Sequence, residues 1–586
     1  MESGKQLDAA RRSGRRRLIF LLTFCALLTA FPAHARAQDS APGGNPVADP
    51  VALAKALYDA GRWDDLLQAF PAAPGNSPQL ELYRGLALAQ LARWPDAAQT
   101  FAAGLARDPR QPRLIEELAG VEYKQRQFAL AKRHLRRALA LQPSDNYASD
   151  FLASIYFQES NLEAALRYWN RAGKPQLSDL DVHGVARLDP VLLDRVFNFS
   201  LGSEWTWDQF LTARARLEAL DTFSNVRFGL AEQSDGSFQL AVDATERDPW
   251  DSSKWQWLAS LFSGLPYQTV SPDFYNLDHA ALNWLSYYRW DDQKHRVHSE
   301  VSAPLWKNPA WQYRVYFDAR NENWNLAQTL LPAAPAAPAW LNLETAVAGV
   351  ELRAIPSGRW SWSETLEYSD RRIRNALGLP AGAAAFLTDC SAVAGRFRLG
   401  RSLIRFPERR FTLDSSASAE IGTFFARPLG RYARLSGDLR STWFPRAQGD
   451  DYEMESRLRA GRTFGEVPFD ELFMLGFDRD NDLWMRGHPG LSDGQKGSAP
   501  LGRNYVLANW DVAKNVYSGS LLKLALGPFV DTGKISDPSG YFGAPRWLWD
   551  TGVQAKIRVF GNFEFVLGYG KDLRTGRNSF YSTVSH

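Results

Sequence analysis

The chain has 586 residues, which is too long for one hydrophobic core, so about two to four domains are expected. A net charge of only +3 excludes a strong global attraction to nucleic acid, and no nucleic-acid partner is expected. The chain combines 21 Trp, 20 Tyr and 34 Phe with a mean hydropathy of −0.34. This combination is typical of transmembrane β-strands, although a soluble α/β enzyme could reach the same average.

Residues 1–37 have the pattern of a secretory signal peptide. Basic residues between Arg11 and Arg17 precede an apolar run, Leu18 to Phe31, and an Ala35-Arg36-Ala37 cleavage site follows. The apolar run is shorter than the roughly 20 residues that a membrane-spanning helix needs, so we expect export rather than a membrane anchor. No later apolar stretch is long enough to span a bilayer as a helix, so any membrane-embedded part must be a β-barrel.

Residues 38–50 are predicted to be a linker, and helical repeats are predicted over 51–175. Their period of 34 residues is that of the tetratricopeptide family. Small residues alternate with one large apolar residue at matching positions, namely Gly85, Ala119 and Ala153; Ala97, Ala131 and Ala165; Phe101, Leu135 and Trp169; and Gly104, Ala138 and Ala172. The small residues let paired helices approach closely, and a degenerate leading hairpin is predicted over 51–70. A generic bundle of helical hairpins is the alternative; in either case we expect a concave scaffold that binds a protein or peptide partner.

A small α/β unit is predicted over 176–248. Its elements are a strand near 177–185, a helix from Asp189 to Phe197, a helix from Trp207 to Leu220, and strands from Val226 to Ala231 and Phe238 to Ala244. The order, and the segments Val182 to Val185, Leu217 to Val226 and Val242 to Glu246, resemble a POTRA (polypeptide-transport-associated) domain. The resemblance implies strand edges that can pair with client chains.

An antiparallel barrel of about 16 strands is predicted over 249–586. The period is two: Trp311, Tyr313, Val315 and Phe317 alternate with polar neighbours, and similar runs follow at 553–559 and 563–570. Each run is about long enough to cross a bilayer when tilted. A soluble sandwich could show the same alternation, but an outward wall so rich in aromatic residues would be unusual for one.

The longest irregular segment lies between about residues 463 and 502. It contains Met485-Arg486-Gly487-His488, and Phe529-Val530-Asp531-Thr532-Gly533 follows on the second strand after it. These motifs are similar to those of the outer-membrane assembly superfamily that includes BamA, TamA and two-partner secretion transporters. In that family an extracellular loop folds back into the barrel, and its arginine meets an F-x-D-x-G motif. The resemblance implies that Arg486 pairs with Asp531, and that the chain lies in the outer membrane, in contact with its lipid, with its N-terminal domains in the periplasm.

The chemistry of these residues suits the pairing that the resemblance implies. A guanidinium in a confined space needs a fixed anionic partner, and a carboxylate can both neutralise and orient it. Gly487 is expected to let the loop turn sharply. Three departures from the family pattern occur. Gly476-Phe477 replaces a pair of glycines, and Asp511 stands where a glutamate is common. The last residues, Phe580 to His586, lack the terminal Phe or Trp that is typical of a barrel-assembly signal.

No catalytic, cofactor-binding or metal-binding motif is found in the sequence. The segment from Gly494 to Ser498 lacks the spacing of a phosphate-binding loop and is interpreted as part of the long loop. We therefore predict a protein that is not an enzyme and needs no cofactor.

Three functions are compatible with these patterns. The first is outer-membrane protein assembly or translocation, in which the periplasmic repeats and the POTRA-like domain bind a client or partner protein. The second is a polysaccharide-export or phage-receptor-like porin with a tetratricopeptide scaffold. The third is a scaffold or adhesin whose barrel is only an anchor.

Overall fold

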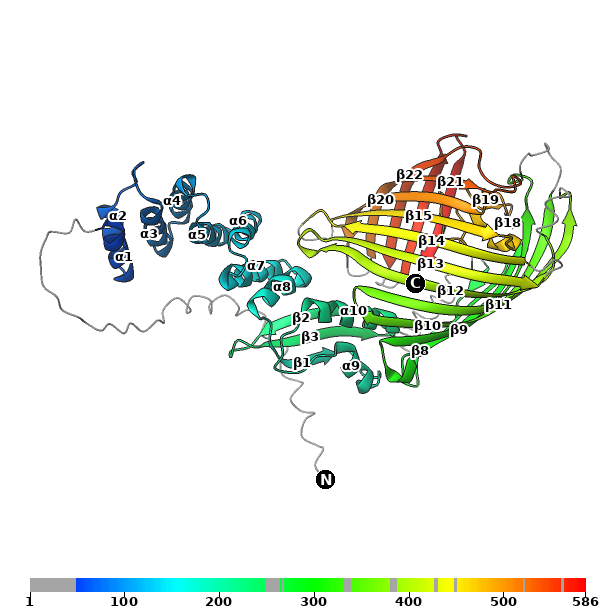
Figure 1. The fold of residues 1–586 in the computed structure, drawn as a ribbon, viewed down its shortest axis with the longest axis horizontal. Helices are drawn as coiled ribbons and strands as arrows, with labels where there is room; N and C mark the ends of the chain where they lie inside the picture. Colours follow the sequence, from blue (N-terminus) through cyan, green and yellow to red (C-terminus); the bar gives the residue numbers. More distant parts are fainter. Residues whose placement is uncertain are drawn as a thin grey trace, which may run out of the picture.

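The computed structural model describes residues 49–247, 264–265, 268–330, 339–379, 387–425, 430–446, 451–519, 522–559 and 563–585. A row of helices leads from the N-terminal side to a small α/β unit, and a large antiparallel sheet of long strands follows (Figure 1). The predicted signal peptide and nearly all of the predicted linker lie outside the described residues. Within the described ranges, no helix is both long and apolar enough to cross a membrane.

The N-terminal helices α1 to α8, which we call the arm, are arranged as successive hairpins. Their bounds are α1 Pro50–Asp59, α2 Trp63–Ala69, α3 Pro78–Gln90, α4 Trp94–Arg107, α5 Pro112–Lys124, α6 Phe128–Leu141, α7 Asn146–Gln158 and α8 Leu162–Trp169. The first helices of three hairpins begin at residues 78, 112 and 146, so the structural repeat equals the 34-residue period of the sequence. Helix α1 begins at Pro50, the last residue of the predicted linker, because Asp49 caps it.

Small residues in the arm allow its paired helices to touch. Gly85 lies against the ring of Phe101, where a Cβ atom would come 2.3 Å from a ring carbon. The matching residues Ala97, Ala131 and Ala165 are fully buried. These contacts explain the repeat physically, while membership of the tetratricopeptide family stays a prediction.

The α/β unit contains β1 (Leu177–His183), α9 (Pro190–Phe197), α10 (Trp207–Leu220), β2 (Phe223–Glu232) and β3 (Phe238–Glu246). Its sheet has the order β1-β3-β2, with β1 parallel to β3. Asp189 caps α9, and Thr206 forms a capping box with Gln209 at the start of α10. Strand β2 begins at Phe223, earlier than the predicted Val226, because Asp221 ends α10 in the left-handed conformation. The POTRA assignment itself stays a prediction.

The C-terminal sheet consists of long antiparallel strands whose order is that of a barrel. The main strands are β7 Leu282–Trp290, β8 Lys294–Pro304, β9 Trp311–Asn325, β10 Trp340–Ser357, β11 Trp360–Leu377, β12 Cys390–Phe406, β13 Phe411–Phe425, β14 Gly430–Trp443, β15 Tyr452–Gly465, β20 Asn504–Ser518, β21 Leu522–Ser536, β22 Leu548–Val559, β23 Phe563–Asp572 and β24 Asn578–Ser585. Short strands β5 (Thr269–Val270) and β6 (Phe274–Leu277) pair with β7. The count of about 16 strands stays a prediction, since residues 248–263 lie outside the described residues.

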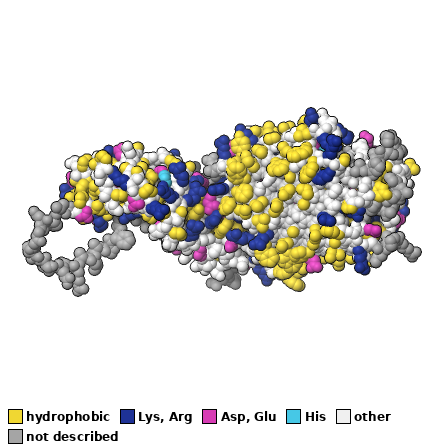
Figure 2. Space-filling model, turned by 45° about the horizontal axis from the view of Figure 1, so that its top comes forward, with side chains coloured by type: hydrophobic (Ala, Val, Ile, Leu, Met, Phe, Trp, Pro, Cys, Tyr) yellow, Lys and Arg dark blue, Asp and Glu magenta, His cyan; other side chains and the backbone are white. Residues whose placement is uncertain are grey.

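The outer wall of the sheet is apolar. Figure 2 shows hydrophobic side chains spread over it, and Val315, Phe317, Leu366 and Val553 are each 46% exposed or more. Their strand neighbours point inward, where many charged side chains are buried, among them Arg371, Glu420 and Asp531. The alternation of the sequence therefore separates an apolar outside from a polar inside.

The arm and the α/β unit contact the turns at one end of the large sheet. Arg405, at the end of β12, donates to Glu163 of α8 (2.8 Å), and Arg167 of α8 lies 3.0 Å from Glu408 in the turn that follows. In the α/β unit, Thr212 of α10 accepts from the backbone of Gly358 (3.0 Å). The helical parts of the chain are thus fixed at the same end of the sheet.

Candidate functional site

The segment between β15 and β20, residues 466–503, folds back against the inner face of the large sheet, and we call it the lid loop. Its ordered pieces are η6 Phe469–Glu471, β16 Phe473–Met474, β17 Leu491–Ser492, β18 Gln495–Lys496 and β19 Leu501–Gly502. Leu475 and Met485 are fully buried, and they form an apolar core with Leu507, Ile535 and Leu548 from the inner faces of β20, β21 and β22. Apolar packing therefore helps to hold the loop against the inner wall.

Arg486 of the lid loop forms a two-pronged ion pair with Asp531 of β21. Its Nε donates to Oδ2 (2.9 Å), its Nη2 donates to Oδ1 (2.5 Å), and its backbone N–H also donates to Oδ2 (2.9 Å). The side chains are 6% and 0% exposed. Asp511 of β20 accepts from the remaining nitrogen, Nη1 (2.5 Å), so the guanidinium has two carboxylate partners.

The other predicted motif residues surround this pair. The ring of Phe529 lies under the guanidinium of Arg486, with 3.8 Å between the ring centroid and the guanidinium carbon. Phe529 is almost fully buried. Gly533 faces Leu475 of the loop, which a Cβ atom would meet at 3.0 Å. Gly487 lies in the turn between Met485 and His488, but its backbone does not have a positive φ.

Position 487 requires a glycine because the inner wall of the sheet lies very close to it. A Cβ atom there would come 2.7 Å from the carboxyl carbon of Asp550 and 2.7 Å from the backbone nitrogen of Asp572. From the sequence, a glycine is expected here because it lets the loop turn sharply. The structure gives another reason, which is the lack of space for a side chain against the wall. From the opposite side, a Cβ atom on Gly570 would meet the Arg486 carbonyl at 2.2 Å, so glycines are packed on both sides of this contact.

Polar side chains of the neighbouring strands support the ion pair. Asn509 of β20 donates to Asp531 (2.7 Å) and accepts from Arg459 of β15 (2.7 Å). Gln554 of β22 donates to Asp511 (2.8 Å) and accepts from Arg486 (3.3 Å). Each charged group of the cluster is therefore hydrogen-bonded, which buried charges require.

His488 connects the loop to two further carboxylates. Its Nδ1 lies 2.9 Å from Asp550 of β22 and its Nε2 lies 3.5 Å from Asp572 of β23. These three residues could in principle hold a metal ion. However, the two ring nitrogens face different carboxylates, which is the geometry of an imidazole bridge between them. The predicted absence of a metal, a cofactor and a catalytic site stays a prediction.

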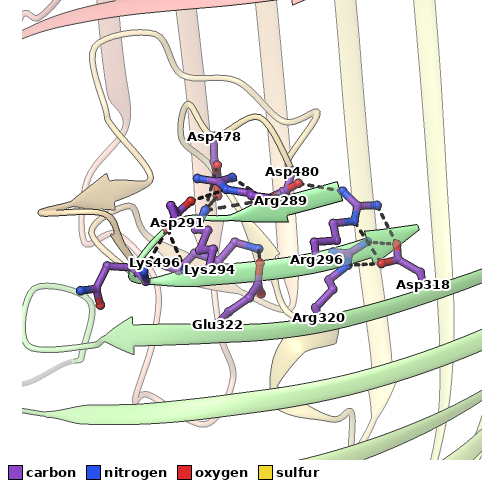
Figure 3. A network of polar contacts seen from close by, with 11 residues as sticks. Arg289, Asp291, Lys294, Arg296, Asp318, Arg320, Glu322, Asp478, Asp480 and Lys496 are labelled. Carbon is purple, nitrogen blue, oxygen red and sulfur yellow. Dashed lines mark hydrogen bonds and ion pairs between the residues drawn. The ribbon is translucent and has the colours of Figure 1, made fainter. Parts of the chain in front are cut away.

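A second polar network anchors the other part of the lid loop on β7, β8 and β9 (Figure 3). Lys294 of β8 donates to Asp478 of the loop at 3.0 and 3.2 Å. Arg296 of β8 donates to Asp480 of the loop (2.8 Å), and Lys496, later in the loop, lies 2.7 Å from Glu322 of β9. The lid loop thus contacts strands from both the beginning and the end of the large sheet.

Only part of this site is predicted from the sequence. The structure brings the predicted Arg486, Gly487, Phe529, Asp531 and Gly533 together. Asp478 and Lys294 were missed, because pairs of opposite charge far apart in a chain leave no local pattern. His488 was named as part of the motif, but its contacts with Asp550 and Asp572 were not predicted. The short segment around Lys496, interpreted as plain loop, contributes a buried charge.

Comparisons with known proteins give fold-level likeness only. No protein-family model matches the chain, and no curated protein shows significant similarity to it. Among solved structures, BamA from Haemophilus ducreyi lacking POTRA domains 1–3 is 12% identical, with a TM-score of 0.41, covering 71% of this chain and 85% of that one. CdiB from Acinetobacter baumannii (12%, TM-score 0.44, 72% and 80%) and CdiB from Escherichia coli (12%, TM-score 0.45, 70% and 75%) are similar to the same degree.

Proposed function

We propose that the chain is an outer-membrane protein that assembles or translocates other proteins. In this proposal the apolar outer wall faces lipid, and the arm and the α/β unit lie in the periplasm, where they bind a client or partner protein. The observation that carries the proposal is the buried Arg486–Asp531 pair, which fixes a long loop inside the barrel. The loop occupies the path that a client would otherwise take, so its position can control passage or insertion.

The charges of the inner wall favour this function over a polysaccharide-export or phage-receptor-like porin. A porin selective for one kind of solute is expected to line its channel with charges of one sign. Here basic and acidic side chains are paired across neighbouring strands, namely Arg314 with Glu351, Arg396 with Glu420 and Arg457 with Asp438. The lid loop also fills part of the interior.

The soluble domains have a defined place in this proposal. Because α8 and α10 contact turns at one end of the sheet, a client bound by the arm is held next to the barrel mouth. A site that only anchored the chain, as in a scaffold or adhesin, would gain nothing from a loop fixed by buried charges. The residues of the lid-loop site are positioning residues, because their described partners are other residues of this chain and the contacts hold the loop in place.

The first experiment identifies what the arm binds. A photo-crosslinking residue replaces Tyr147, whose side chain is 64% exposed on α7, in the full-length protein in intact cells. Capture of unfolded secreted or outer-membrane proteins is expected. Capture restricted to components of polysaccharide synthesis would overturn the proposal in favour of the export alternative.

The second experiment tests the lid loop with Arg486→Ala. We expect the variant to capture the same client but to lose its delivery, while resistance of the barrel to unfolding by heat in detergent shows that it remains folded. Arg372→Ala, a change of an exposed arginine on β11, is the matched control. Normal client delivery by the Arg486→Ala variant would contradict the proposed role of the loop.

A further inference from the structure

The outer wall of the barrel contains a hollow over strands β12 to β15, β20 and β21. Its volume is about 910 Å³, and its lining is mostly apolar. The floor is made of small residues, Ala417 and Ala419 of β13, Gly437 of β14 and Ala460 of β15. A wall that faces lipid is expected to be covered by large apolar side chains, so this local loss of side-chain volume needs an occupant.

The register of the strands shows why the hollow forms. One row of directly opposed residues runs Leu399, Ala417, Gly437, Ala460, Val506 and Lys534. The next row runs Phe397, Ala419, Leu435, Arg462 and Asn504. Side chains that are directly opposed lie on the same face of a sheet, so the small residues are adjacent and the larger ones bound them.

The large apolar side chains at the sides of the hollow point outward. Phe397 and Leu399 are 47% and 40% exposed, and Leu435 and Val506 are 50% and 40% exposed. Trp547, which also lines the hollow, is 50% exposed. Aromatic residues of this kind gather at the level of lipid headgroups. The hollow therefore extends from the apolar belt to its interface.

Two cations lie at the end of the hollow that is far from the arm. Arg462 stacks on Phe464 (4.8 Å), and no carboxylate of the described residues pairs with it. The ammonium of Lys534 donates to the Ala544 carbonyl (2.7 Å), which leaves other N–H groups for a ligand. A basic side chain on the lipid-facing wall is costly unless it reaches the interface or an anion.

We propose that the hollow binds one phosphorylated lipid of the outer leaflet, of the lipid A type. Its acyl chains lie on the floor of small residues, and its phosphate lies between Arg462 and Lys534. A phosphate matches a hollow that is lined by two cations, and acyl chains match its apolar floor, whereas an uncharged lipid would leave both cations without a counter-charge. This inference rests on the proposed function in that the outer wall faces lipid and the arm lies in the periplasm.

The apolar part of the site is tested by filling it. At Gly437 an added Cβ atom meets nothing closer than the Ser416 carbonyl at 4.0 Å, so Gly437→Leu should fold normally. Gly395 of β12 is the matched control, because it lies on the same wall outside the hollow and has nothing within 4 Å. We expect Gly437→Leu to lose bound lipid and Gly395→Leu to retain it.

The charged part is tested with the double variant Arg462→Gln and Lys534→Gln. The full-length protein is placed in nanodiscs of phosphatidylcholine that contain bisphosphorylated lipid A, dephosphorylated lipid A, or inorganic phosphate in the buffer. Lipid that remains bound on release from the disc is counted by native mass spectrometry. Loss of two charge-assisted contacts should weaken retention of the phosphorylated lipid by about tenfold or more, with little change for the dephosphorylated form.

The outcomes separate the possible occupants. Retention of one phosphorylated lipid that depends on Gly437, Arg462 and Lys534 supports the site. Equal retention of both lipid forms, binding of inorganic phosphate alone, or a second protein copy in place of the lipid overturns it. Failure of client delivery by the protein would leave these lipid measurements unchanged, so the two proposals fail separately.

Discussion

Lys294 of β8 and Asp478 of the lid loop lie 184 residues apart in the chain, and their charged groups meet 3.0 Å apart. Their side chains are 1% and 0% exposed. A pair this deeply buried holds the loop only while both charges are present, because either charge alone is costly to bury. The lid loop therefore has an anchor on the early strands that does not depend on Arg486.

Asp478→Asn should loosen this anchor. The change leaves Lys294 with Asp480 as its nearest carboxylate, at 3.7 Å, and removing one partner of a buried pair typically costs about 3–5 kcal/mol. We expect faster proteolysis within the lid loop of the folded protein. The exposed pair of Arg446 and Asp451 provides the control, since Asp451→Asn should have little effect.

The double variant Lys294→Met and Asp478→Leu separates the cost of a buried unpaired charge from the loss of the side-chain contact between β8 and the lid loop. Apolar residues of similar volume avoid the unpaired charge, so the double variant should be more resistant to proteolysis than Asp478→Asn alone. Equal sensitivity of the two would show that the pair itself does not hold the loop.

Gly487→Ala should displace Arg486 from Asp531. The new methyl group would overlap the carboxyl of Asp550 and the backbone of β23, and such overpacking typically costs about 1–3 kcal/mol. We expect lower client delivery and a lid loop that is cut more rapidly by protease. Gly395→Ala, where space is open, should behave as the unaltered protein does. Unchanged delivery and protection in Gly487→Ala would contradict the close packing.

Arg405→Glu should detach α8 from the barrel turn. Both partners of the Glu163–Arg405 pair are mostly buried, so the change places two carboxylates against each other. Spin labels on α8 and on the turn after β12 should report a broader range of distances. The reversed pair, Glu163→Arg with Arg405→Glu, should restore a narrow distribution; if it does not, the charges are not what fixes the arm.

The stability of the arm should depend on pH through Glu116 of α5. Burial, and then the nearby Asp145 carboxylate, raise the pKa of Glu116 from 4.5 to about 7. The folded arm therefore holds this proton more tightly than the unfolded chain, and the stability it contributes is full below about pH 4.5 and is lost as pH rises through about 7. Thermal unfolding followed by far-ultraviolet circular dichroism should show a lower midpoint for helix loss at about pH 8 than at about pH 5. Glu116→Gln should reduce this difference.

Much of the architecture was predictable because it depends on local periodicity. The 34-residue repeat predicted successive helical hairpins, and their first helices begin at residues 78, 112 and 146, since small residues at a fixed spacing determine where the helices touch. The two-residue alternation in β9 predicted a strand with Val315 and Phe317 outward. The ends of helices and strands were less predictable. Strand β2 begins at Phe223 because Asp221, in the left-handed conformation, ends the preceding helix just before it.

The candidate site was predictable only where two short motifs carried it. Arg486 and Asp531 could be paired in advance because their motifs resemble those of the outer-membrane assembly superfamily, in which the two motifs meet. The reason for a glycine at position 487 could not be predicted. It depends on the distance from the loop to β22 and β23, and no local sequence pattern contains that distance. Lys294 and Asp478 are ordinary charged residues, and only the folded chain shows that they are buried together.

The contact of Glu163 with Arg405 joins residues 242 positions apart. A chain synthesised from its N-terminus presents the arm long before β12 and β13 exist, so the arm can fold from local contacts while its docking partner is still to be made. During that interval α8 is free of the turn, and the arm is tethered only through the chain that follows it. The arm is therefore among the first parts to fold and among the last to be fixed in place.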